Sequence, residues 1–356
     1  MNLTTFLNGG ILQIADTAAR FYLGNRKGQA FLRGAVGGLR KNARLREQYE
    51  KEGTHIPPFL IASVASRCNL HCAGCYARAT GGCTETKNDL TADEWRHVFS
   101  EAEKIGVSFI LLAGGEPFMN RAVIEAAAEF PRIIFPIFTN GTLIEENDLA
   151  LLDEHRNLIP VLSREGDDAR TDARRGAGVS EMVSGVCEKL NARGILYGCS
   201  ITATRENMDA VTEPAFAHAL REDGCGVAFY VEYVPAEKDT EHLVLTGEDI
   251  AALAVRIEAL RAEKGMIVLS FPGDEEAMGG CLAAGRGFFH INATGGAEPC
   301  PFSPFSGMNV RDHALIDVIR SDFFAAVRAI GAAEAQNHTG GCALFGHQSE
   351  VAAFLH

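Results

Sequence analysis

Short apolar runs alternate with stretches of helical periodicity through the middle of the chain. Six runs read as β-strands, at residues 59–65, 108–113, 133–138, 158–162, 195–202 and 227–234. Helical spacing of apolar residues fills the intervals at residues 92–104, 121–129, 146–154 and 180–191. Strands that alternate with helices in this way form a parallel sheet. The sequence therefore predicts an α/β protein whose core is a partial (β/α)6 barrel of the TIM type.

Three cysteines lie close together directly after the first of these strands. Cys68, Cys72 and Cys75 have the spacing C-x3-C-x2-C in a loop that begins where the apolar run ends. Three thiolates on one short loop can hold three irons of a [4Fe-4S] cluster and leave the fourth iron open for a ligand. The loop therefore predicts an iron-sulfur cluster with a reactive iron.

Zinc sites and disulfide bonds are the other common uses of closely spaced cysteines. A structural zinc site needs a fourth Cys or His, and the nearby candidates are His71, inside the loop, and Cys83, which has no paired partner. Disulfide frameworks are typical of small secreted chains, and this 356-residue sequence has no recognisable signal peptide at its start. The spacing favours the iron-sulfur cluster over both alternatives.

Glycine and polar residues follow three further strands at the point where each strand ends. The second strand leads into Gly114-Gly115-Glu116-Pro117, the third into Thr139-Asn140-Gly141, and the fourth into Ser163-Arg164-Glu165-Gly166. In β/α barrels the loops after the strands meet at one rim around a ligand, so the cysteine loop, Glu116, Asn140 and Ser163 should face one mouth. Alone, each motif also reads as ordinary structure, either a strand-to-helix turn or a helix cap.

These motifs, in this order, resemble the radical SAM enzymes over about residues 58 to 345. The resemblance implies a [4Fe-4S] cluster on Cys68, Cys72 and Cys75 that binds S-adenosylmethionine (SAM), with the aromatic Tyr76 directly after the last cysteine. It implies that SAM is cleaved reductively to a 5′-deoxyadenosyl radical, which takes a hydrogen atom from a substrate. It also implies an electron donor such as a flavodoxin or ferredoxin.

The resemblance further assigns SAM-binding residues. Glu116 would place an anion beside the SAM amine, and Gly114 and Gly115, followed by Pro117, would let the backbone approach closely. Ser163 and Glu165 would bind the ribose hydroxyls, and Asn140 and Tyr76 complete the set. Arg175, in a D-x-x-R-G stretch, has two interpretations: a solvated arginine at a helix start, or a ligand of the SAM carboxylate or of the substrate. The sequence assigns no catalytic residue on the substrate side.

A second group of cysteines lies near the C-terminal end. Cys281 and Cys300 frame a predicted hairpin, and Cys342 follows in a glycine-rich stretch. This region resembles the SPASM extension of radical SAM enzymes, or its shortened form called twitch, which carries auxiliary clusters. A full SPASM extension has more cysteines, so these three support one auxiliary [4Fe-4S] cluster at most. Its fourth ligand is left open between His338, His347 and substrate or an exogenous ligand, and burial of all three cysteines as small apolar residues is the alternative.

The remaining four cysteines show no ligand-like spacing. Cys187, Cys199 and Cys225 lie on a predicted helix, a strand and a turn, where packing in the core is the expected role. Cys83 lies in a glycine-rich loop just past the cysteine loop. A thiol there could serve as an acid or hydrogen-atom donor, although no catalytic role is predicted for it.

Charge is distributed unevenly along the chain. Residues 1–51 hold nine Lys or Arg against three Asp or Glu, although the whole chain has a net charge of −13. This segment has apolar residues at helical spacing, which indicates a helical cap on the acidic barrel or, alternatively, a docking segment for a partner, an acidic peptide or a membrane surface. The predicted domains are a basic helical N-terminal extension (1–54), the barrel core (55–240), and a linker helix with the auxiliary-cluster region (241–356).

Composition limits the cellular setting. The negative net charge argues against general nucleic-acid binding, and no apolar run is long enough to span a bilayer. Ten cysteines in a chain with 47% hydrophobic residues suit a cytoplasmic enzyme whose thiols stay reduced.

The SPASM and twitch resemblance points first to oxidative modification of a peptide or protein. The alternative within this chemistry is small-molecule or cofactor biosynthesis, such as rearrangement of a nucleotide or trimming of a tetrapyrrole. The alternatives from other classes are a non-catalytic iron-sulfur electron carrier or scaffold, and a zinc-dependent structural protein.

Overall fold

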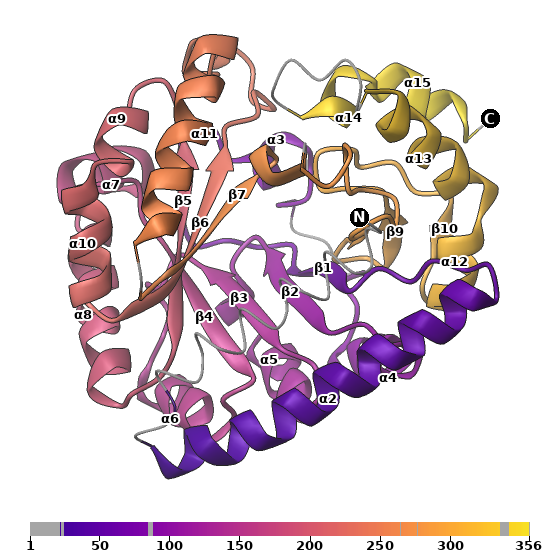
Figure 1. Ribbon diagram of the computed structural model, residues 1–356, viewed down its shortest axis with the longest axis horizontal. Coiled ribbons are helices and arrows are strands. Elements are labelled where there is room, and N and C mark those ends of the chain that lie inside the picture. The colour runs from indigo at the N-terminus through magenta and orange to yellow at the C-terminus, as the bar shows by residue number, and fades with distance from the viewer. Residues whose placement is uncertain are drawn as a thin grey trace.

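Seven parallel strands form the centre of the computed structural model (Figure 1). The structure describes residue 22 and residues 25–84, 88–263, 265–275, 277–334 and 342–355. The strands pair in sequence order: β1 (Phe59–Ala65), β2 (Phe109–Gly114), β3 (Phe135–Thr139), β4 (Leu158–Ser163), β5 (Tyr197–Ala203), β6 (Cys225–Glu232) and β7 (Ile267–Phe271). The predicted α/β partial barrel is confirmed. Its sheet continues past residue 240, because β7 is a seventh parallel strand that the apolar pattern did not reveal.

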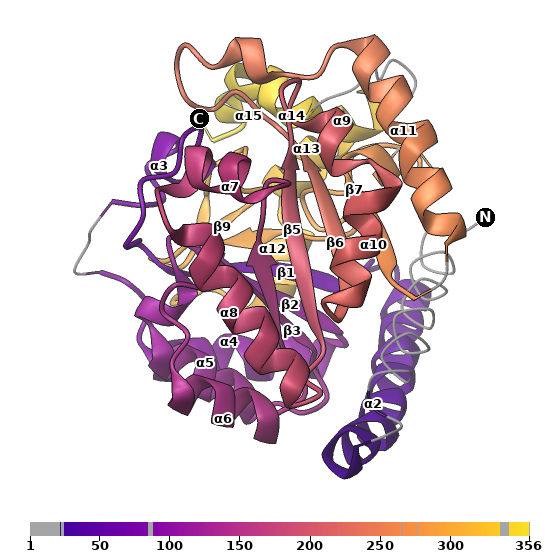
Figure 2. The ribbon, with the colours of Figure 1, turned by 90° about the vertical axis from the view of Figure 1, so that its left-hand side faces the viewer.

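Helices cover the outer face of the sheet (Figures 1 and 2). They are α4 (Ala92–Ile105), α5 (Arg121–Ala128), α6 (Glu146–Glu154), α7 (Asp168–Arg175), α8 (Val179–Ala192), α9 (Met208–Val211), α10 (Pro214–Glu222) and α11 (Gly247–Ala262). Side chains that point outward from the strands pack with these helices in one core, as Leu60, Ala62 and Val64 do with Trp95 and Phe99. The helices predicted between the first five strands are thus confirmed, each to within one residue at either end.

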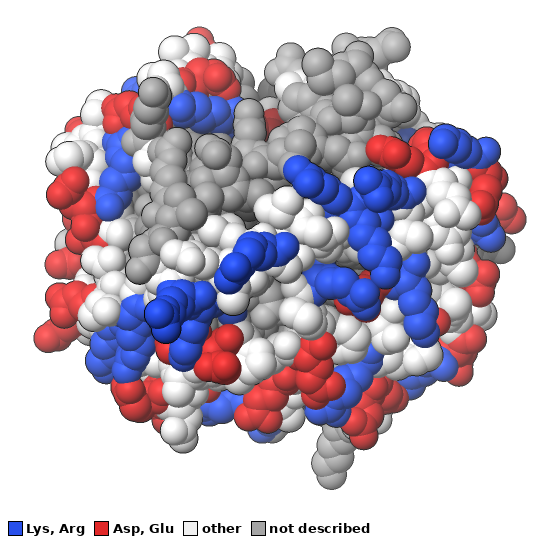
Figure 3. Space-filling model, turned by 60° about the horizontal axis from the view of Figure 1, so that its bottom comes forward, with Lys and Arg blue, Asp and Glu red and all other residues white. Residues whose placement is uncertain are grey.

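The helix α2 (Arg26–Lys51) lies across the end of the barrel where the strands begin (Figure 1). Tyr22 and Leu39 are buried there against residues at the starts of four successive strands, namely Phe109, Ile134, Ile159 and Leu196. The Asn42 side chain donates to the carbonyls of Val107 (3.0 Å) and Arg132 (3.3 Å). The predicted helical cap on the barrel is confirmed for this helix. Its outer face is basic, and a band of Lys and Arg crosses this side of the molecule (Figure 3).

The C-terminal region extends the sheet at its other edge. The short strand β8 (His290–Ile291) pairs in parallel with β1, β9 (Gly296–Glu298) pairs antiparallel with β8, and β10 (Met308–Asn309) pairs antiparallel with β9. The predicted hairpin between Cys281 and Cys300 is therefore confirmed. Around it lie η3 (Gly273–Glu275), α12 (Leu315–Arg320), α13 (Asp322–Glu334), α14 (Ala343–Gly346) and α15 (Gln348–Ala353). No helix in the described ranges is long and apolar enough to cross a membrane.

Candidate active site

The loop after β1 carries the N-terminal cysteine set, which we define as Cys68, Cys72 and Cys75. It ends at the short helix α3 (Tyr76–Ala79), and all three thiols are half-buried and free of disulfide bonds. The helix α7 and the loop after β6 hold it in place: the Ala73 N–H donates to the Arg174 carbonyl (2.9 Å), and the Gly74 N–H donates to the Glu237 carboxylate (2.6 Å). The protein itself thus positions the three thiols.

The chemistry of these thiols fits metal ligation. Burial raises the pKa of Cys68 to about 11 and also raises the pKa of Cys72, although Arg175 and Arg174 partly offset the effect at Cys72. Such thiols become thiolates at neutral pH when they bind a cationic metal centre. No three Cys, His, Asp or Glu side chains in the described part of the chain are close enough to share a single metal ion. In a [4Fe-4S] cluster each thiolate binds a different iron.

Gly114 and Gly115 at the end of β2 allow a close approach of two backbone segments. A Cβ on Gly115 would lie 2.0 Å from the Arg67 carbonyl oxygen, and one on Gly114 would lie 2.5 Å from the Ala65 carbonyl oxygen. The N–H groups of Gly115 and Glu116 donate to these same two oxygens, both at 2.7 Å. The glycines therefore join the GGEP motif to the start of the cysteine loop.

The Glu116 carboxylate is buried between the ends of β2 and β3. It accepts hydrogen bonds from the Phe118 N–H (3.1 Å), the Thr139 hydroxyl (2.7 Å) and the Asn140 N–H (2.8 Å). Burial raises its pKa, and these hydrogen bonds oppose the rise. Pro117 is buried at the start of the single turn η1 (Pro117–Met119) that Glu116 caps. This carboxylate fixes the rim between two strands.

Asn140 reaches from the end of β3 to the cysteine loop. Its side-chain nitrogen lies 3.9 Å from the Cys68 sulfur and donates to the Asn69 side-chain oxygen at 2.9 Å. The predicted meeting of strand-end residues at one mouth is realised for Asn140 and the cysteine loop.

Glu165 and Arg175 form a buried ion pair after β4. The Glu165 carboxylate accepts from Arg174 (2.5 Å) and from two nitrogens of Arg175 (2.9 and 2.5 Å), and the Thr202 N–H donates to its other oxygen (3.2 Å). Burial alone lowers the pKa of Arg175, but Glu165 and Cys72 more than offset this, so the pKa is raised. Arg175 is the last residue of α7 and only 11% exposed, which contradicts the solvated helix-start interpretation.

Ser163 and Tyr76 differ in the contacts that their side chains make with the rest of the protein. Ser163, the last residue of β4, is half-buried, and its hydroxyl makes no hydrogen bond with the described residues. The Tyr76 ring packs on Phe302 with 5.1 Å between centroids. Burial raises the Tyr76 pKa, and the next largest causes of the rise are electrostatic repulsion from Cys75 and from Cys300. Tyr76 therefore lies between the cysteine loop and the C-terminal region.

Cys281, Cys300 and Cys342, which we call the C-terminal cysteine set, are brought together from distant positions. Burial raises the pKa of all three thiols. At Cys300, electrostatic repulsion from Cys342 and Cys281 is the next largest cause of the raised pKa. The described backbone also donates to each sulfur, from Ala283, from Phe302, and from Phe345 and Leu344. The three sulfurs therefore occupy one neighbourhood, in which Cys300 is buried and Cys281 and Cys342 are half-buried.

The structure adds an acidic residue that sequence reasoning missed. Glu275, in η3, is buried, accepts the Leu282 N–H at 3.0 Å and acts electrostatically on all three cysteines of the C-terminal set. Burial raises its pKa to about 7. No local pattern marks it within the acidic run at residues 274–276. Of the histidines considered as ligands, His347 contacts Glu350 (3.0 Å), and His338 lies outside the described residues.

The other cysteines match their expected places. Cys187, Cys199 and Cys225 are buried in the core, as predicted. Cys83 is half-buried in the loop after α3.

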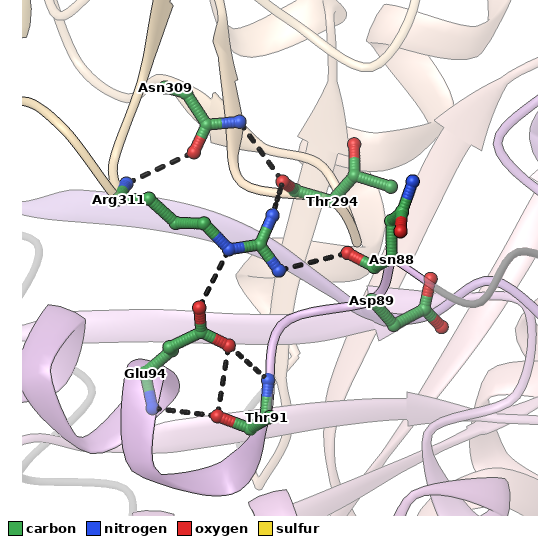
Figure 4. Close-up of a pocket in the computed structure, with 7 residues that line it drawn as sticks. All are labelled: Asn88, Asp89, Thr91, Glu94, Thr294, Asn309 and Arg311. Carbon is green, nitrogen blue, oxygen red and sulfur yellow. Dashed lines mark hydrogen bonds and ion pairs between the residues drawn. The ribbon is translucent and has the colours of Figure 1, made fainter.

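A polar cavity of about 550 Å³ lies between the start of α4 and the C-terminal hairpin (Figure 4). Arg311 crosses it and donates to the Glu94 carboxylate (2.6 Å) and to the carbonyls of Thr294 (2.8 Å) and Asn88 (2.9 Å). None of the predicted site residues lines this cavity. It is a junction between the barrel and the C-terminal extension.

Comparison with known proteins agrees with this arrangement. The sequence model of the radical SAM superfamily matches residues 63–211, which include the N-terminal cysteine set, the GGEP motif and Arg175. AdoMet-dependent heme synthase of Methanosarcina barkeri is 25% identical over 296 residues, which cover 74% of this chain and 82% of that protein. PqqA peptide cyclase of Rhizobium meliloti is 28% identical over 301 residues, which cover 77% of this chain and 76% of that protein.

Solved structures share the fold. Streptococcus suis SuiB bound to precursor peptide SuiA superposes with a TM-score of 0.65 at 19% identity, over 81% of this chain and 71% of that chain. The fold, the cysteine loop and the matched domain lead to one assignment. The chain belongs to the radical SAM superfamily as an enzyme with a C-terminal extension of the SPASM or twitch type.

Proposed function

We propose that this enzyme carries out an oxidative modification of a peptide or protein. The observation that carries the proposal is the position of Tyr76 between the two cysteine sets. Tyr76 follows Cys75 directly, and its ring packs on Phe302, two residues after Cys300. Two cluster sites that are linked through one aromatic contact would suit a reaction that begins with a radical and ends with the removal of an electron. The peptide cyclase among the relatives, and the peptide-bound structure among the neighbours, support a peptide as the substrate.

The N-terminal cysteine set would hold the cluster that binds SAM. When bound, cluster and SAM supply a 5′-deoxyadenosyl radical that takes a hydrogen atom from the substrate. The chain's own residues would hold SAM against the rim: backbone at Gly114 and Gly115, the Glu116 carboxylate for the amine, and the Ser163 hydroxyl for the ribose. Placing the reacting groups in one geometry is the protein's main contribution to such a step.

Glu165 and Arg175 would act as a pair beside this site. Because Glu165 is already held by Arg174 and Arg175, its carboxylate would fix the direction of the Arg175 guanidinium. A fixed guanidinium is suited to bind the SAM carboxylate or an anionic group of the substrate. Asn140 would orient the cluster loop through its contact with Cys68.

The C-terminal cysteine set would hold one auxiliary [4Fe-4S] cluster, with the Glu275 carboxylate beside it. Backbone N–H groups that donate to the sulfurs tune the potential of such clusters. A flavodoxin or ferredoxin would deliver the electron that starts the reaction, and cytoplasmic location stays a prediction.

The first experiment compares the cluster content of three variants after anaerobic reconstitution. Iron, sulfide, EPR spectra and 5′-deoxyadenosine formation are measured for the wild type, for Cys68/Cys72/Cys75→Ala and for Cys281/Cys300/Cys342→Ala. Cys187→Ala, in the core of α8, is the matched control for loss of a thiol. We expect the first triple variant to keep a cluster and lose SAM cleavage. A wild type that binds iron but never cleaves SAM would instead support the electron carrier or scaffold.

Substrate class is tested with the wild type and synthetic copies of short peptides encoded beside its gene. The proposed reaction predicts a product two hydrogen atoms lighter than the peptide, together with 5′-deoxyadenosine. The heme synthase among the relatives makes a tetrapyrrole the second candidate, so iron coproporphyrin is incubated in parallel. Turnover of the porphyrin, with every peptide unchanged, would reverse the order of the two candidates.

A further inference from the structure

Ser303 has a buried hydroxyl beside the C-terminal cysteine set. The residue is 0% exposed, and its hydroxyl makes no hydrogen bond within the described part of the chain. Ser303 pairs with Cys300 in an antiparallel bridge, and its N–H donates to the Cys300 carbonyl at 2.9 Å. Residues directly opposite each other in such a bridge point their side chains to the same side. The Ser303 hydroxyl and the Cys300 sulfur therefore face the same space.

This hydroxyl fits a polar group bound next to Cys300. A buried hydroxyl without a hydrogen bond costs about 1–3 kcal/mol, so such groups are rare in folded proteins. The sulfurs of an iron-sulfur cluster accept hydrogen bonds from the protein. The surroundings of Cys300 thus fit the auxiliary cluster of the proposed function.

Glu275 brings a buried carboxylate to the same cysteines. One of its oxygens accepts the N–H of Leu282 at 3.0 Å, and its main-chain carbonyl accepts the N–H of Gly280 at 2.8 Å. These two contacts tie Glu275 to both residues that flank Cys281 in the sequence. Its charge also acts on all three thiols of the C-terminal cysteine set. The carboxylate therefore belongs to the neighbourhood that the three sulfurs share.

The described residues give this carboxylate no ion pair. Arg286 is the opposite charge that acts on Glu275 most strongly, but its guanidinium donates to the carbonyls of Gly280 (2.6 Å) and Cys281 (2.9 Å). Glu232, also buried, adds a second negative charge nearby. Only one oxygen of Glu275 accepts a hydrogen bond from the described residues. Because buried carboxylates are normally paired with a cation or bound to a metal, the other oxygen is suited to a metal centre.

We propose that Glu275 is the fourth protein ligand of the auxiliary cluster and binds the iron that Cys281, Cys300 and Cys342 leave open. The inference rests on the proposed function, which assigns a [4Fe-4S] cluster to these cysteines. One bond forms between a carboxylate oxygen and iron, no oxidation state changes, and any proton on the carboxyl group goes to solvent. Each ligand binds a different iron, in agreement with the finding that no three such side chains in the described ranges could share one metal ion.

Four protein ligands close this cluster. A substrate then finds no open iron at the C-terminal cysteine set, which leaves electron exchange as the contribution of this site to the proposed oxidation. The open iron lies instead at the N-terminal cysteine set, where SAM would bind.

The test starts from the full chain with alanine at all three positions of the N-terminal cysteine set. This background carries only the auxiliary cluster, so the assay needs neither SAM nor a peptide. Glu275→Gln removes the anionic ligand and keeps a carbonyl oxygen for the Leu282 N–H. Glu232→Gln neutralises the neighbouring buried carboxylate and is the matched control.

Affinity for the fourth iron separates the outcomes. After anaerobic reconstitution and mild oxidation, an iron chelator is titrated in, and EPR measures conversion of the [4Fe-4S] cluster to a [3Fe-4S] cluster. Since even the outer partners of a metal ligand change affinity by about 10- to 100-fold, Glu275→Gln should lower the affinity for this iron at least about 10-fold. Glu232→Gln should retain it. An unchanged affinity in Glu275→Gln, or an equal loss in Glu232→Gln, overturns the inference.

Urea unfolding of the iron-free proteins separates ligation from a structural contact. Glu275→Gln should leave the unfolding free energy of the iron-free form unchanged, because the Leu282 hydrogen bond is kept. A loss of unfolding free energy in the iron-free form that matches the loss of iron affinity would show a structural contact and overturn the ligation.

A further readout detects the bond itself. The background protein is labelled with ¹³C-glutamate, its cluster is reduced, and electron–nuclear double resonance measures coupling of ¹³C to the cluster spin. Coupling should be present with Glu275 and lost in Glu275→Gln; its absence, or its persistence in the variant, overturns the ligation. If the alanine background forms no cluster, the auxiliary cluster of the proposed function fails together with this inference. If Glu275 proves to be a ligand and the wild type modifies no peptide, only the proposed function fails.

Discussion

Replacing Gly115 by alanine should separate the GGEP motif from the cysteine loop. An added Cβ would lie 2.0 Å from the Arg67 carbonyl oxygen and 2.4 Å from its carbon, whereas ordinary contact begins at 3.4 Å. The two segments must therefore move apart, which breaks the 2.7 Å hydrogen bonds to Ala65 and Arg67. Two backbone hydrogen bonds at about 1 kcal/mol each, with the added strain, predict a loss of about 2–4 kcal/mol in unfolding free energy.

Anaerobic urea unfolding measures this loss, and iron analysis with 5′-deoxyadenosine formation reports the state of the loop. Gly37→Ala is the matched control, because Gly37 is exposed on α2 and no atom lies within 4 Å of an added Cβ. Alanine should stabilise that helix by about 1 kcal/mol. The steric reasoning would be refuted if Gly115→Ala had the same unfolding free energy, iron content and rate of SAM cleavage as the wild type.

Three further perturbations probe other parts of the molecule. Tyr22→Ala should lower the unfolding free energy by about 3–5 kcal/mol in urea titrations, because it empties a fully buried site at the barrel end. Glu94→Gln should cost about 0.5 kcal/mol at neutral pH, since the Arg311 contact is partly exposed to solvent. Hydrogen bonds from Arg311 and Thr91 lower the Glu94 pKa from 4.5 to about 2, so urea titrations should show this stabilisation above pH 4.5 and its loss as the pH falls toward 2. Serine at all three positions of the C-terminal cysteine set should remove about half of the bound iron. Formation of the peptide product should stop, while formation of 5′-deoxyadenosine continues.

The sequence predicted those features that depend on residues close together along the chain, such as the ends of the strands. Strand ends follow from the length of apolar runs, so the positions of Glu116, Asn140 and Ser163 on the rim could be derived before any coordinates. The partners of these side chains could not. Whether Glu116 would accept three hydrogen bonds from the protein and Ser163 none depends on distances between strands, which periodicity does not encode.

Features built from distant segments were missed for the same reason. The side chains of Ser63 and His290 are hydrogen-bonded at 2.8 Å across more than two hundred residues of sequence, and each alone reads as an ordinary residue of a strand or hairpin. Glu275 has no signature apart from its acidic neighbours, and β7 has only five residues. Only the pairing of remote segments gives these residues their surroundings.

The pairing of β8 with β1 has a consequence for how the protein is made. His290 follows its partner Ile61 by 229 residues. At synthesis rates of about 5–20 residues per second, the outer edge of β1 emerges roughly 10–45 s before the strand that covers it. During that interval the nascent chain displays an unpaired strand edge next to the cysteine loop, and such edges invite pairing with other chains. The time for which that edge needs protection on the ribosome is thus set by how late in translation the hairpin appears.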